Sequence, residues 1–526
     1  MIANHLSLAD YIFSAIEKYD TFIAIKIGVR RISYHELNEK ALKVADLLLG
    51  NGAKDETIGI VGQRKASSYF GILGILYSGC NYTPLNTKYS KERLLNIMKS
   101  SNVRYLVGDK DDLINFFEII GSDYKFNGVV IPEGKSPVGE SWIEVSNQNF
   151  ITKPIIKSSD DIAYILFTSG STGLPKGVQV SNSNVIAFIK GMNQLYKIDP
   201  GFNASQTFDL SFDPSVSDMF FTWYNGGVLC ILPEEEKMSP NEYIIREEIH
   251  FWNSVPSLAS FMYKMGSLKS AAFPSIKNSM FCGEQFPKNI ADAWRLAAPN
   301  STIENLYGPT EATIYISRYN YEVKDINKHF KNSIIPIGNP FPNQDFEIIN
   351  DKNLPVKKGE IGEICFKGSQ ITKGYLNEEY KTNEVFVEFE WDQDERLYKW
   401  YKTGDLGFVN SDGAIECIGR KDSQIKLAGR RIEIGEIESI IQKFEDLSDI
   451  VIIPIRDKFD IVIGCVGFTT LNISKEIEFY IRKNSEASLE KVFFPKKIIK
   501  IDQFPLTISG KIDRKALSNL IEDKNV

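Results

Sequence analysis

Histidine and cysteine are scarce and scattered in this sequence. Its 526 residues include only four histidines, and its six cysteines contain no Cys-x-x-Cys pair. Zinc sites and disulfide frameworks need such residues at close, regular spacing, so the sequence predicts neither of them. Cysteines without a pairing pattern are typical of proteins in a reducing compartment, and we expect a cytoplasmic protein.

An excess of positive charge is also absent. The chain has 61 lysine and arginine residues against 68 aspartate and glutamate residues, which gives a net charge of −7. Proteins that bind nucleic acids usually carry a basic excess, so we expect no nucleic-acid partner.

No hydrophobic run is long enough to indicate a membrane protein. The most apolar region, residues 69–85, is interrupted by three glycines and ends near a proline. It is shorter than the roughly 20 residues that cross a bilayer, and we interpret it as a buried helix that leads into a strand. The N-terminus has no basic segment followed by an apolar core, so neither a signal peptide nor a membrane partner is expected.

The order of apolar and polar segments predicts a multidomain protein of mixed α/β and α+β class. Strand-like and helix-like segments alternate up to about residue 335, as in parallel-rich sheets that are flanked by helices. Short β-rich segments follow, and the final segment again mixes helices and strands. We therefore expect a large N-terminal domain of residues 1–421, with a small β-subdomain at about 336–421, and a small α+β C-terminal domain of residues 422–526.

Residues 166–180 predict a phosphate-binding loop. They read LFTSGSTGLPKGVQV and combine glycines, four hydroxyl side chains and one lysine after an apolar run. Glycines let a ligand approach the backbone, and N–H, O–H and ammonium groups bind phosphate oxygens. The spacing is not that of a Walker A motif, and a flexible surface loop is the alternative interpretation. A helix is predicted over residues 182–196 with Asn182 or Ser183 as its cap, which would place the loop beside a helix N-terminus.

Together with this loop, further segments resemble the motifs of one enzyme family. In chain order they are ISYHELN (32–38), SGCNYTPLNTKYSKERL (78–94), FTSGSTGLPKGV (167–178), NLYGPTEAT (305–313), GEICFKG (362–368), YKTGDLG (401–407), GRKDSQIKLAGRRIEIGEIE (419–438) and PLTISGKIDRKAL (505–517). On these residues the chain resembles the adenylate-forming enzymes, which include acyl-CoA synthetases, luciferases and the adenylation domains of nonribosomal peptide synthetases. It is most similar to stand-alone amino-acid adenylation domains.

The resemblance implies a reaction in two steps, with ATP and Mg²⁺ as cofactors. A carboxylate attacks the α-phosphate of ATP and forms an acyl-adenylate with release of pyrophosphate, and a thiol then takes the acyl group. Such transfers depend on positioning and on the stabilisation of negative charge.

The resemblance also implies which residues bind the nucleotide. Lys176 would hold the β- and γ-phosphates together with the loop residues Thr168, Ser169, Gly170, Ser171, Thr172 and Gly173. Thr310 would contact the α-phosphate, and Glu311 would bind Mg²⁺, which prefers carboxylate and phosphate oxygens. Tyr307 would stack on the adenine, next to Asn305, Leu306, Gly308 and Pro309.

Two acceptor oxygens suit Asp405 to the two ribose hydroxyls, and Arg420 resembles a second ribose or phosphate contact. Lys511 resembles the lysine that bridges the substrate carboxylate and the α-phosphate, where it would neutralise two anions that repel each other. Asp422 matches the family's hinge. The C-terminal domain would rotate there, bringing in Lys511 for adenylation and the loop at 427–433 for thioester formation.

Asp213 lies where amino-acid-activating members of the family keep the aspartate that binds the substrate ammonium. A carboxylate in an apolar pocket needs a cationic partner, which an amino acid supplies. The alternative is an ordinary N-cap aspartate before a proline. By resemblance, the walls of the pocket are Pro214, Ser217, Ser254, Met280, Cys282, Leu306, Ile314 and Tyr315.

These walls are uncharged and of modest size, so we expect a small or medium uncharged α-amino acid as substrate. FWNSVPS (251–257) and Cys282 resemble D-alanine–carrier-protein ligases, whereas Pro214 and Ser217 depart from that pattern. A D-alanine ligase proper and an acyl- or aryl-CoA ligase are the alternatives. A non-catalytic relative is a third one, against which the intact set Lys176, Glu311, Asp405 and Lys511 argues.

The sequence ends 15 residues after Lys511 without a segment that resembles a carrier protein. We therefore expect a stand-alone enzyme that transfers its product to the phosphopantetheine arm of a separate carrier protein.

Overall fold

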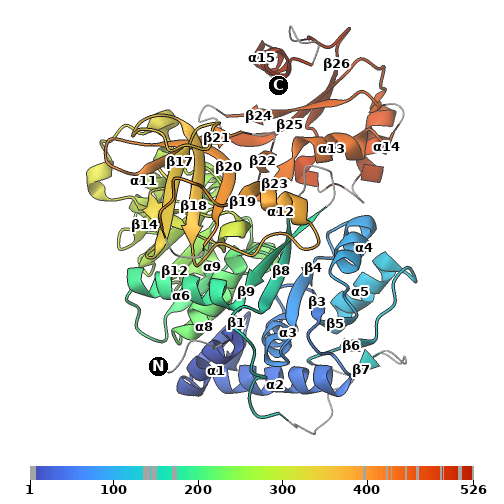
Figure 1. The fold of residues 1–526 in the computed structure, drawn as a ribbon, viewed down its shortest axis with the longest axis vertical. Coiled ribbons are helices and arrows are strands. Elements are labelled where there is room, and N and C mark those ends of the chain that lie inside the picture. Colours follow the sequence, from blue (N-terminus) through green and yellow to red (C-terminus); the bar gives the residue numbers. More distant parts are fainter. Residues whose placement is uncertain are drawn as a thin grey trace.

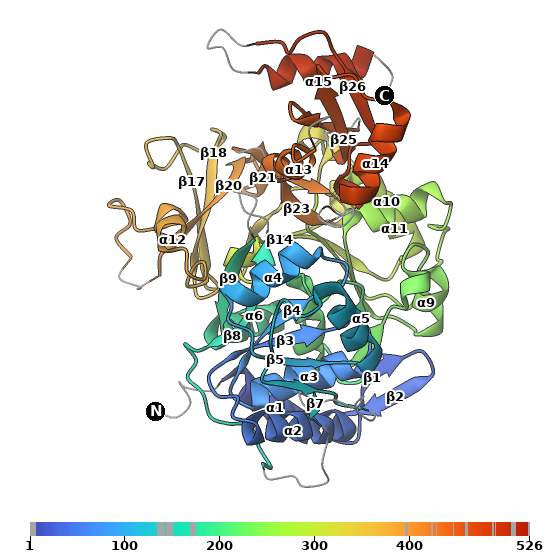
Figure 2. The same ribbon diagram turned by 90° about the vertical axis from the view of Figure 1, so that its right-hand side faces the viewer.

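The computed structural model describes residues 7–133, 142–143, 151–168, 175–394, 398–421, 424–427, 429–444, 447–457, 461–485, 489, 491–506 and 512–523. Two large sheets and their helices form the lower part of the molecule in Figure 1, and a smaller C-terminal domain lies above them. The view from the side shows the same arrangement (Figure 2).

The larger sheet contains nine strands among the described residues. In spatial order they are β16 (Asn339–Pro340), β15 (Ser317–Asn320), β14 (Thr302–Tyr307), β13 (Asn278–Cys282), β12 (Phe251–Ser254), β10 (Asn203–Gln206), β11 (Val228–Ile231), β1 (Ile23–Ile27) and β2 (Arg30–Ser33). The six strands from β14 to β1 pair in parallel, and the remaining strands pair antiparallel at the two edges.

The second large sheet contains seven strands in the part of the chain that the structure describes. Their order is β7 (Trp142–Ile143), β6 (Gly128–Val130), β5 (Tyr105–Gly108), β3 (Thr57–Val61), β4 (Asn81–Leu85), β8 (Ile162–Thr168) and β9 (Lys176–Ser181). All neighbours are parallel except β8 and β9, which form an antiparallel hairpin. The parallel-rich architecture agrees with the prediction.

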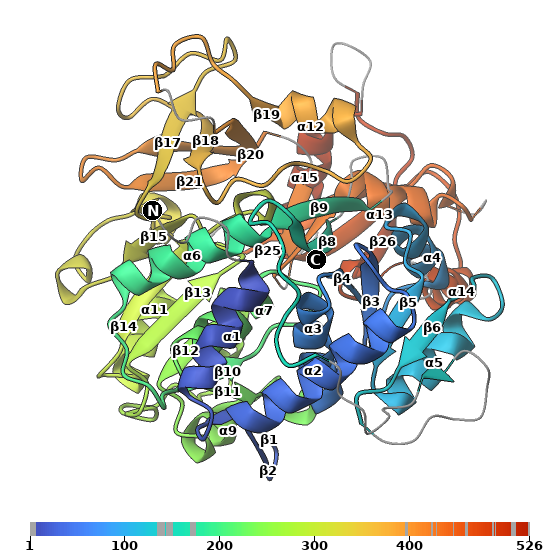
Figure 3. The same ribbon diagram turned by 60° about the horizontal axis from the view of Figure 1, so that its bottom comes forward.

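Helices cover both faces of each large sheet. Between the sheets lie α1 (Leu8–Lys18), α2 (Tyr34–Gly50), α3 (Ala66–Tyr77), α6 (Asn182–Leu195) and the run formed by α7 (Pro214–Val216), a π-helix (Ser217–Phe221) and α8 (Thr222–Tyr224). Figure 3 shows α1, α2, α3 and α6 across the bottom of this layer. The outer faces carry α4 (Lys91–Ser100) and α5 (Lys110–Ile120) on the seven-stranded sheet, and α9 (Asn241–Arg246), α10 (Pro256–Lys264) and α11 (Lys288–Ala297) on the other.

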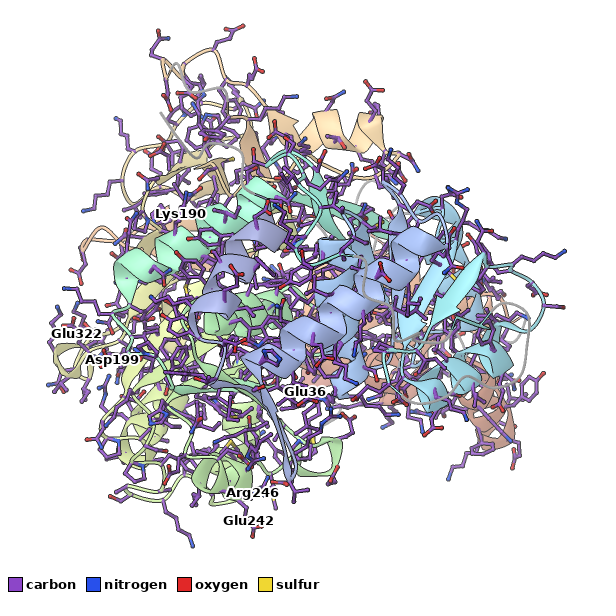
Figure 4. All side chains as sticks on the ribbon, turned by 90° about the horizontal axis from the view of Figure 1, so that it is seen from below. Glu36, Lys190, Asp199, Glu242, Arg246 and Glu322 are labelled. Atoms are coloured by element: carbon purple, nitrogen blue, oxygen red, sulfur yellow. The ribbon has the colours of Figure 1, made fainter. Side chains whose placement is uncertain are left out.

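The largest hydrophobic core lies between the two sheets because apolar residues of both sheets pack onto the same helices. On α6, Val185, Phe188 and Ile189 are buried, whereas Lys190 is exposed. Figure 4 shows Lys190 on this helix and Asp199 beyond its C-terminal end, on the face that is seen from below. This division of apolar and charged residues is typical of an amphipathic helix at the edge of a core.

The predicted β-subdomain is an antiparallel sheet. It consists of β17 (Gln344–Ile349), β18 (Gly362–Gly368), β20 (Trp400–Val409), β19 (Phe386–Val387) and β21 (Ile415–Arg420), with α12 (Glu379–Val385) beside it. Gly407 of β20 packs so closely that an added Cβ would lie 2.5 Å from the carbonyl oxygen of Glu416 on β21.

The C-terminal domain has its own hydrophobic core. It contains the hairpin β22 (Gln424–Leu427) and β23 (Arg430–Glu433), the sheet of β24 (Val451–Arg456), β25 (Val462–Thr469) and β26 (Lys497–Lys500), and the helices α13 (Ile434–Ile441), α14 (Lys475–Ser485) and α15 (Arg514–Asp523). The predicted boundary residue Asp422 lies outside the described residues, so the division at 421/422 stays a prediction. Among the described helices, none has the length and hydropathy that a membrane span requires.

The predicted position of the helix after the glycine-rich loop was wrong in two respects. The cap is Ser181, whose hydroxyl accepts from the backbone N–H of Asn184, and not Asn182 or Ser183. Between the loop and α6 runs the whole six-residue strand β9, which at about 3.3 Å per residue separates them by roughly 20 Å. The helix N-terminus therefore does not lie beside the base of the loop. The prediction was wrong because periodicity alone did not reveal the strand between them.

The packing of α2 against α3 depends on Gly74. A Cβ at this position would lie 2.5 Å from Cβ of Val44 and 2.7 Å from the carbonyl oxygen of Ala41. We predict that Gly74→Ala lowers the free energy of unfolding by about 1–3 kcal/mol, the usual effect of overpacking, in urea titrations. Gly50→Ala at the end of α2 is the matched control, because no atom of the described residues would lie within 4 Å of the added Cβ. An equal loss in both variants would contradict the prediction.

Candidate active site

A cavity lies where the large sheets, the β-subdomain and the C-terminal domain meet. The large domain contributes the ends of β8 (Leu166, Phe167, Thr168), the segment from Phe208 to Pro214, and the loops that follow β12, β13 and β14. These loops leave the carboxyl ends of parallel strands, which is where open α/β folds bind ligands. The β-subdomain contributes Asp405 and Arg420 to the same cavity.

Asp213 is a buried carboxylate with no positively charged partner among the described residues. It occupies the N-cap position of α7, with Pro214 at the first helical position, but its side chain makes no capping hydrogen bond. Its Oδ2 is buried and has no hydrogen-bond partner among the described residues. Burial raises the pKa of Asp213 to about 7, and the negative charge of Glu311 acts in the same direction, whereas the Thr310 side chain opposes the shift. The N-cap interpretation of Asp213 is therefore not supported.

The cavity brings together part of the expected pocket walls. Pro214, Cys282, Ile314 and Tyr315 line it together with Asp213. The other expected walls are buried next to these residues but do not line the cavity: Ser217, Ser254, Met280 and Leu306. Ser254, for example, accepts a hydrogen bond from Trp252 Nε1 at 3.0 Å.

The backbone is strained in the segment that carries the wall residues Ile314 and Tyr315. Thr313 and Ile314 have φ angles of 54° and 71°, a region that a β-branched residue such as isoleucine rarely adopts. Gln370 of the β-subdomain holds this segment, because its Nε2 donates to the carbonyl oxygens of Thr313 at 3.2 Å and of Tyr315 at 2.7 Å. No signal in the sequence indicated this role for Gln370, since the contact joins residues about 55 positions apart.

A second group of expected residues surrounds Glu311. It lies in a 3₁₀-helix (Thr310–Ala312), is fully buried, and accepts a hydrogen bond from the Tyr375 hydroxyl at 2.7 Å. The ammonium of Lys176 lies 4.7 Å from the centroid of the Tyr375 ring. A carboxylate in this setting fits a hard divalent cation such as Mg²⁺, although the described residues contain no cluster of three acidic, histidine or cysteine ligands.

The base of the glycine-rich loop is the β8–β9 hairpin. Thr168 and Lys176 are register partners at its end, and Thr168 lines the cavity. Its Oγ1 is buried and has no hydrogen-bond partner among the residues that the structure describes. The loop residues Ser169, Gly170, Ser171, Thr172 and Gly173 lie outside the described residues, as do Asp422 and Lys511.

A third group joins the end of β14 to the β-subdomain. The Tyr307 hydroxyl donates to Asp405 Oδ2, and Arg420 Nη1 donates to Asp405 Oδ1 at 2.9 Å. Asp405 and Arg420 face each other as register partners on β20 and β21. Asn305 donates to the carbonyl oxygens of Ile335 and Pro336, each at 2.9 Å, so in this structure its amide holds a neighbouring loop.

The hairpin of the C-terminal domain reaches this cavity. Its lining residues are Lys426, Gly429, Arg430 and Ile432. The backbone N–H of Gly429 donates to Glu284 Oε1 of the large domain at 2.7 Å, and the Arg430 guanidinium lies 5.5 Å from the centroid of the Phe212 ring. The expected loop at 427–433 thus lies at the site in this arrangement.

An ion pair lies beside the cavity, which Arg93 and Tyr89 line. Arg93 of α4 lies 3.4 Å from Glu436 of α13 and 4.5 Å from the centroid of the Tyr89 ring. Burial raises the pKa of Glu436 to about 7, and the charge of Arg93 opposes this shift. The contact links the two domains and was not predicted.

Asp213 generates a prediction about stability. Since its pKa rises from 3.8 to about 7 in the folded state, the folded protein keeps a proton that the unfolded chain releases between these values. Stability is therefore lost as the pH increases through this range, by up to about 4 kcal/mol. We predict that Asp213→Asn raises the free energy of unfolding in urea titrations, and by more at pH 8 than at pH 5.

Asp209 provides the matched control. It is also buried, but it accepts hydrogen bonds from Asn86 at 2.9 Å and from the backbone of Ser211 at 3.0 Å. Asp209→Asn should not stabilise the protein, and a loss of stability in Asp213→Asn at pH 8 would contradict the account of Asp213.

Comparisons with known proteins agree with this geometry. The family model of the AMP-binding enzyme matches residues 13–376. The chain is 32% identical over 511 residues to zwittermicin A synthase ZmaJ of Bacillus cereus, which covers 95% of this chain and 93% of that protein. It is 30% identical over 525 residues to the D-alanine–D-alanyl carrier protein ligase of Listeria monocytogenes, which covers 98% of this chain and 99% of the ligase.

The fold is also found among solved structures. The Vibrio cholerae adenylation domain AlmE, solved in complex with glycyl-adenosine-5'-phosphate, superposes with a TM-score of 0.86 at 25% sequence identity, over 99% of each chain. A large N-terminal domain and a small C-terminal domain are common to both. The chain therefore belongs to the AMP-binding enzymes, as an adenylate-forming enzyme of the adenylation-domain type.

Proposed function

We propose that this enzyme activates a small or medium uncharged α-amino acid as an aminoacyl-adenylate and transfers it to the phosphopantetheine thiol of a separate carrier protein in the cytoplasm. The buried carboxylate of Asp213 carries this proposal, because it has no cationic partner among the described residues and its Oδ2 accepts no hydrogen bond from them. An ammonium group would pair with it and lower its pKa, so that binding of an amino acid removes the penalty of the buried charge.

The nucleotide would occupy the remainder of this cavity and an adjoining one, which is lined by Asn305, Tyr307, Asp405 and Arg420. Asp405 binds the ribose hydroxyls, with Arg420 beside it, and Tyr307 provides the aromatic face for the adenine. Lys176 and the Thr168 hydroxyl hold the β- and γ-phosphates, since an ammonium and an O–H donor both bind phosphate oxygens. Mg²⁺ bound by Glu311 and the phosphates would supply positive charge against the phosphate oxygens.

In the first half-reaction, a carboxylate oxygen of the amino acid attacks the α-phosphorus and pyrophosphate leaves. Thr310, next to Glu311, contacts the α-phosphate, and Lys511 approaches the two anions as they meet. In the second half-reaction, the carrier thiol attacks the carbonyl carbon and AMP leaves. The chain's contribution to both steps is alignment and charge stabilisation.

The position of the C-terminal domain supports a role for its hairpin in the second step. The hairpin residues Gly429 and Arg430 line the cavity, whereas α15, which begins three residues after Lys511, lies at the outer end of the small domain (Figures 1 and 2). Rotation at Asp422 would exchange the two elements, as expected for a hinge between domains.

The names of two relatives support the substrate class. The Vibrio structure holds glycyl-adenosine-5'-phosphate, and the Listeria relative is a D-alanine–D-alanyl carrier protein ligase. Both amino acids are small and uncharged. A D-alanine–carrier-protein ligase is the second candidate, which Cys282 in the lining of the cavity favours. An acyl- or aryl-CoA ligase is disfavoured because its substrate would leave Asp213 buried without a cation.

Amino-acid-dependent ATP–pyrophosphate exchange tests this function directly. We predict exchange with D- or L-amino acids of small to medium uncharged side chain and none with the matching acids that lack an amine. Asp213→Ala should lower kcat/KM by an amount that corresponds to a loss of about 3–5 kcal/mol of transition-state stabilisation, the range for breaking a buried ion pair. The exposed Asp199 gives the control Asp199→Ala, which should leave exchange unchanged. Exchange only with amine-free acids, or a loss below tenfold in Asp213→Ala, would reject the proposal.

A variant of Lys511 should affect only the first of the two half-reactions. We predict that Lys511→Ala greatly slows pyrophosphate exchange but leaves transfer from a preformed aminoacyl-adenylate to a carrier thiol intact, because the lysine acts only while the two anions meet. Lys515→Ala on α15 is the matched control, since Lys515 is exposed in the same segment. Normal exchange in Lys511→Ala would show that the assigned mechanism is wrong.

A further inference from the structure

A chain of buried polar groups lies behind the amino-acid pocket. Asn253, at the end of β12, donates from its Nδ2 to Asp218 Oδ1 at 2.8 Å and to the Tyr315 hydroxyl oxygen at 2.9 Å. All three side chains are at most 5% exposed. Tyr315 lines the cavity, whereas Asp218 and Asn253 lie behind it.

The orientation of Asn253 is over-determined. A carboxamide nitrogen has two hydrogens, and here one points to Asp218 and the other to Tyr315. The backbone of Asn253 is fixed as well, because its N–H donates to Ser205 Oγ at 3.0 Å and its carbonyl oxygen accepts from Thr207 Oγ1 at 2.6 Å. The amide therefore donates to Tyr315 and cannot turn away without leaving buried groups unsatisfied.

Asp218 is placed by an irregular helix. It lies in the π-helix that follows Pro214, five residues after the ammonium-binding aspartate. Such π segments occur often at functional sites. Its Oδ2 is buried and has no hydrogen-bond partner among the described residues, and burial raises its pKa well above the usual value. A protonated Asp218 still accepts from Asn253 through Oδ1, so its role does not require a charge.

The hydroxyl of Tyr315 retains a proton that these contacts do not use. Its oxygen accepts from Asn253, and Cys282 Sγ lies 3.4 Å away. Burial raises the pKa of Cys282, so this side chain is a neutral thiol. The thiol also lies 4.0 Å from Asn253 Oδ1, so its S–H can donate to that oxygen or to the Tyr315 hydroxyl oxygen. Among the described residues, the Tyr315 O–H then faces only the weakly accepting sulfur. This O–H is available to a substrate oxygen in the cavity, which Tyr315 lines.

We propose that Tyr315, held in position by Asn253 and Asp218, makes the pocket select an amino acid whose side chain carries a hydroxyl or carboxamide oxygen over its apolar isostere. This inference rests on the proposed function and narrows its substrate class. Tyr315 contacts the substrate, and Asn253 and Asp218 are positioning residues. A pocket with a buried donor rejects an apolar analogue because the donor then stays unpaired.

The test compares isosteric pairs in pyrophosphate exchange: threonine against valine, and asparagine against leucine. The wild-type protein should favour the polar member of at least one pair in kcat/KM by about 5- to 150-fold, as expected for an unsatisfied buried group. Tyr315→Phe should reduce this ratio to about 1. The ratio of the kcat/KM values of two substrates, measured on one protein preparation, does not depend on the fraction of folded protein.

Variants of Asp218 test the positioning role. Asp218→Asn keeps an acceptor oxygen and should retain the preference, whereas Asp218→Leu should lose it mainly through a higher KM for the polar substrate. Tyr77→Phe is the matched control, because Tyr77 is buried on α3 and its hydroxyl has no hydrogen-bond partner among the described residues. It should leave the ratio unchanged.

The outcomes distinguish this inference from the proposed function. Exchange that favours valine and leucine would overturn the proposed selection by Tyr315 but not the proposed function. The same holds if Tyr315→Phe leaves the ratio of the kcat/KM values of the two substrates unchanged. A preference for lysine or arginine would overturn it as well, since Asp218 would then contact the substrate directly. The absence of exchange with every amino acid would reject the proposed function itself.

Discussion

Residues 308–315 after β14 fold back on themselves so tightly that a Cβ on Gly308 would lie 2.2 Å from the carbonyl oxygen of Ile314. This turn positions Glu311 and Tyr315 on one short segment, so the proposed phosphate and amino-acid ends of the site have a fixed relation. The positive φ angles of Thr313 and Ile314 are the strain that this geometry requires. Gln370 and Tyr375 compensate for it, because each contributes hydrogen bonds to the turn from the β-subdomain.

The turn also concentrates negative charge. Asp213 and Asp405 line the cavity, Glu311 follows the lining residue Thr310, and each of the three acidic residues is at most 9% exposed. Buried carboxylates raise one another's pKa and lower stability unless cations compensate them. Arg420 compensates Asp405, whereas Asp213 has no such partner among the described residues. A substrate with an ammonium group would supply the missing charge, so the same feature that destabilises the free protein would favour binding of the proposed amino-acid substrate.

Much of this arrangement follows from local sequence patterns. The alternation of strand-like and helix-like segments predicted the parallel-rich sheets and the helices that flank them. The position of the glycine-rich loop relative to α6 was predicted wrongly, because a short strand such as β9 gives no strong periodic signal before a helix. Asp213 was found through its motif, but whether it was a cap or a free carboxylate depended on the hydrogen bonds around it.

The sequence by itself determined the family, the order of the elements and the residue types that surround the cavity, since these depend on neighbours along the chain. Tertiary structure decided which of these residues share a wall. Gln370 reaches Tyr315 across 55 positions, and Asn253 reaches Asp218 across 35 positions and Tyr315 across 62 positions. Hydrogen bonds over such separations follow no helical or strand period. They form only because packing of the sheets and the β-subdomain leaves buried donors and acceptors that must pair with one another.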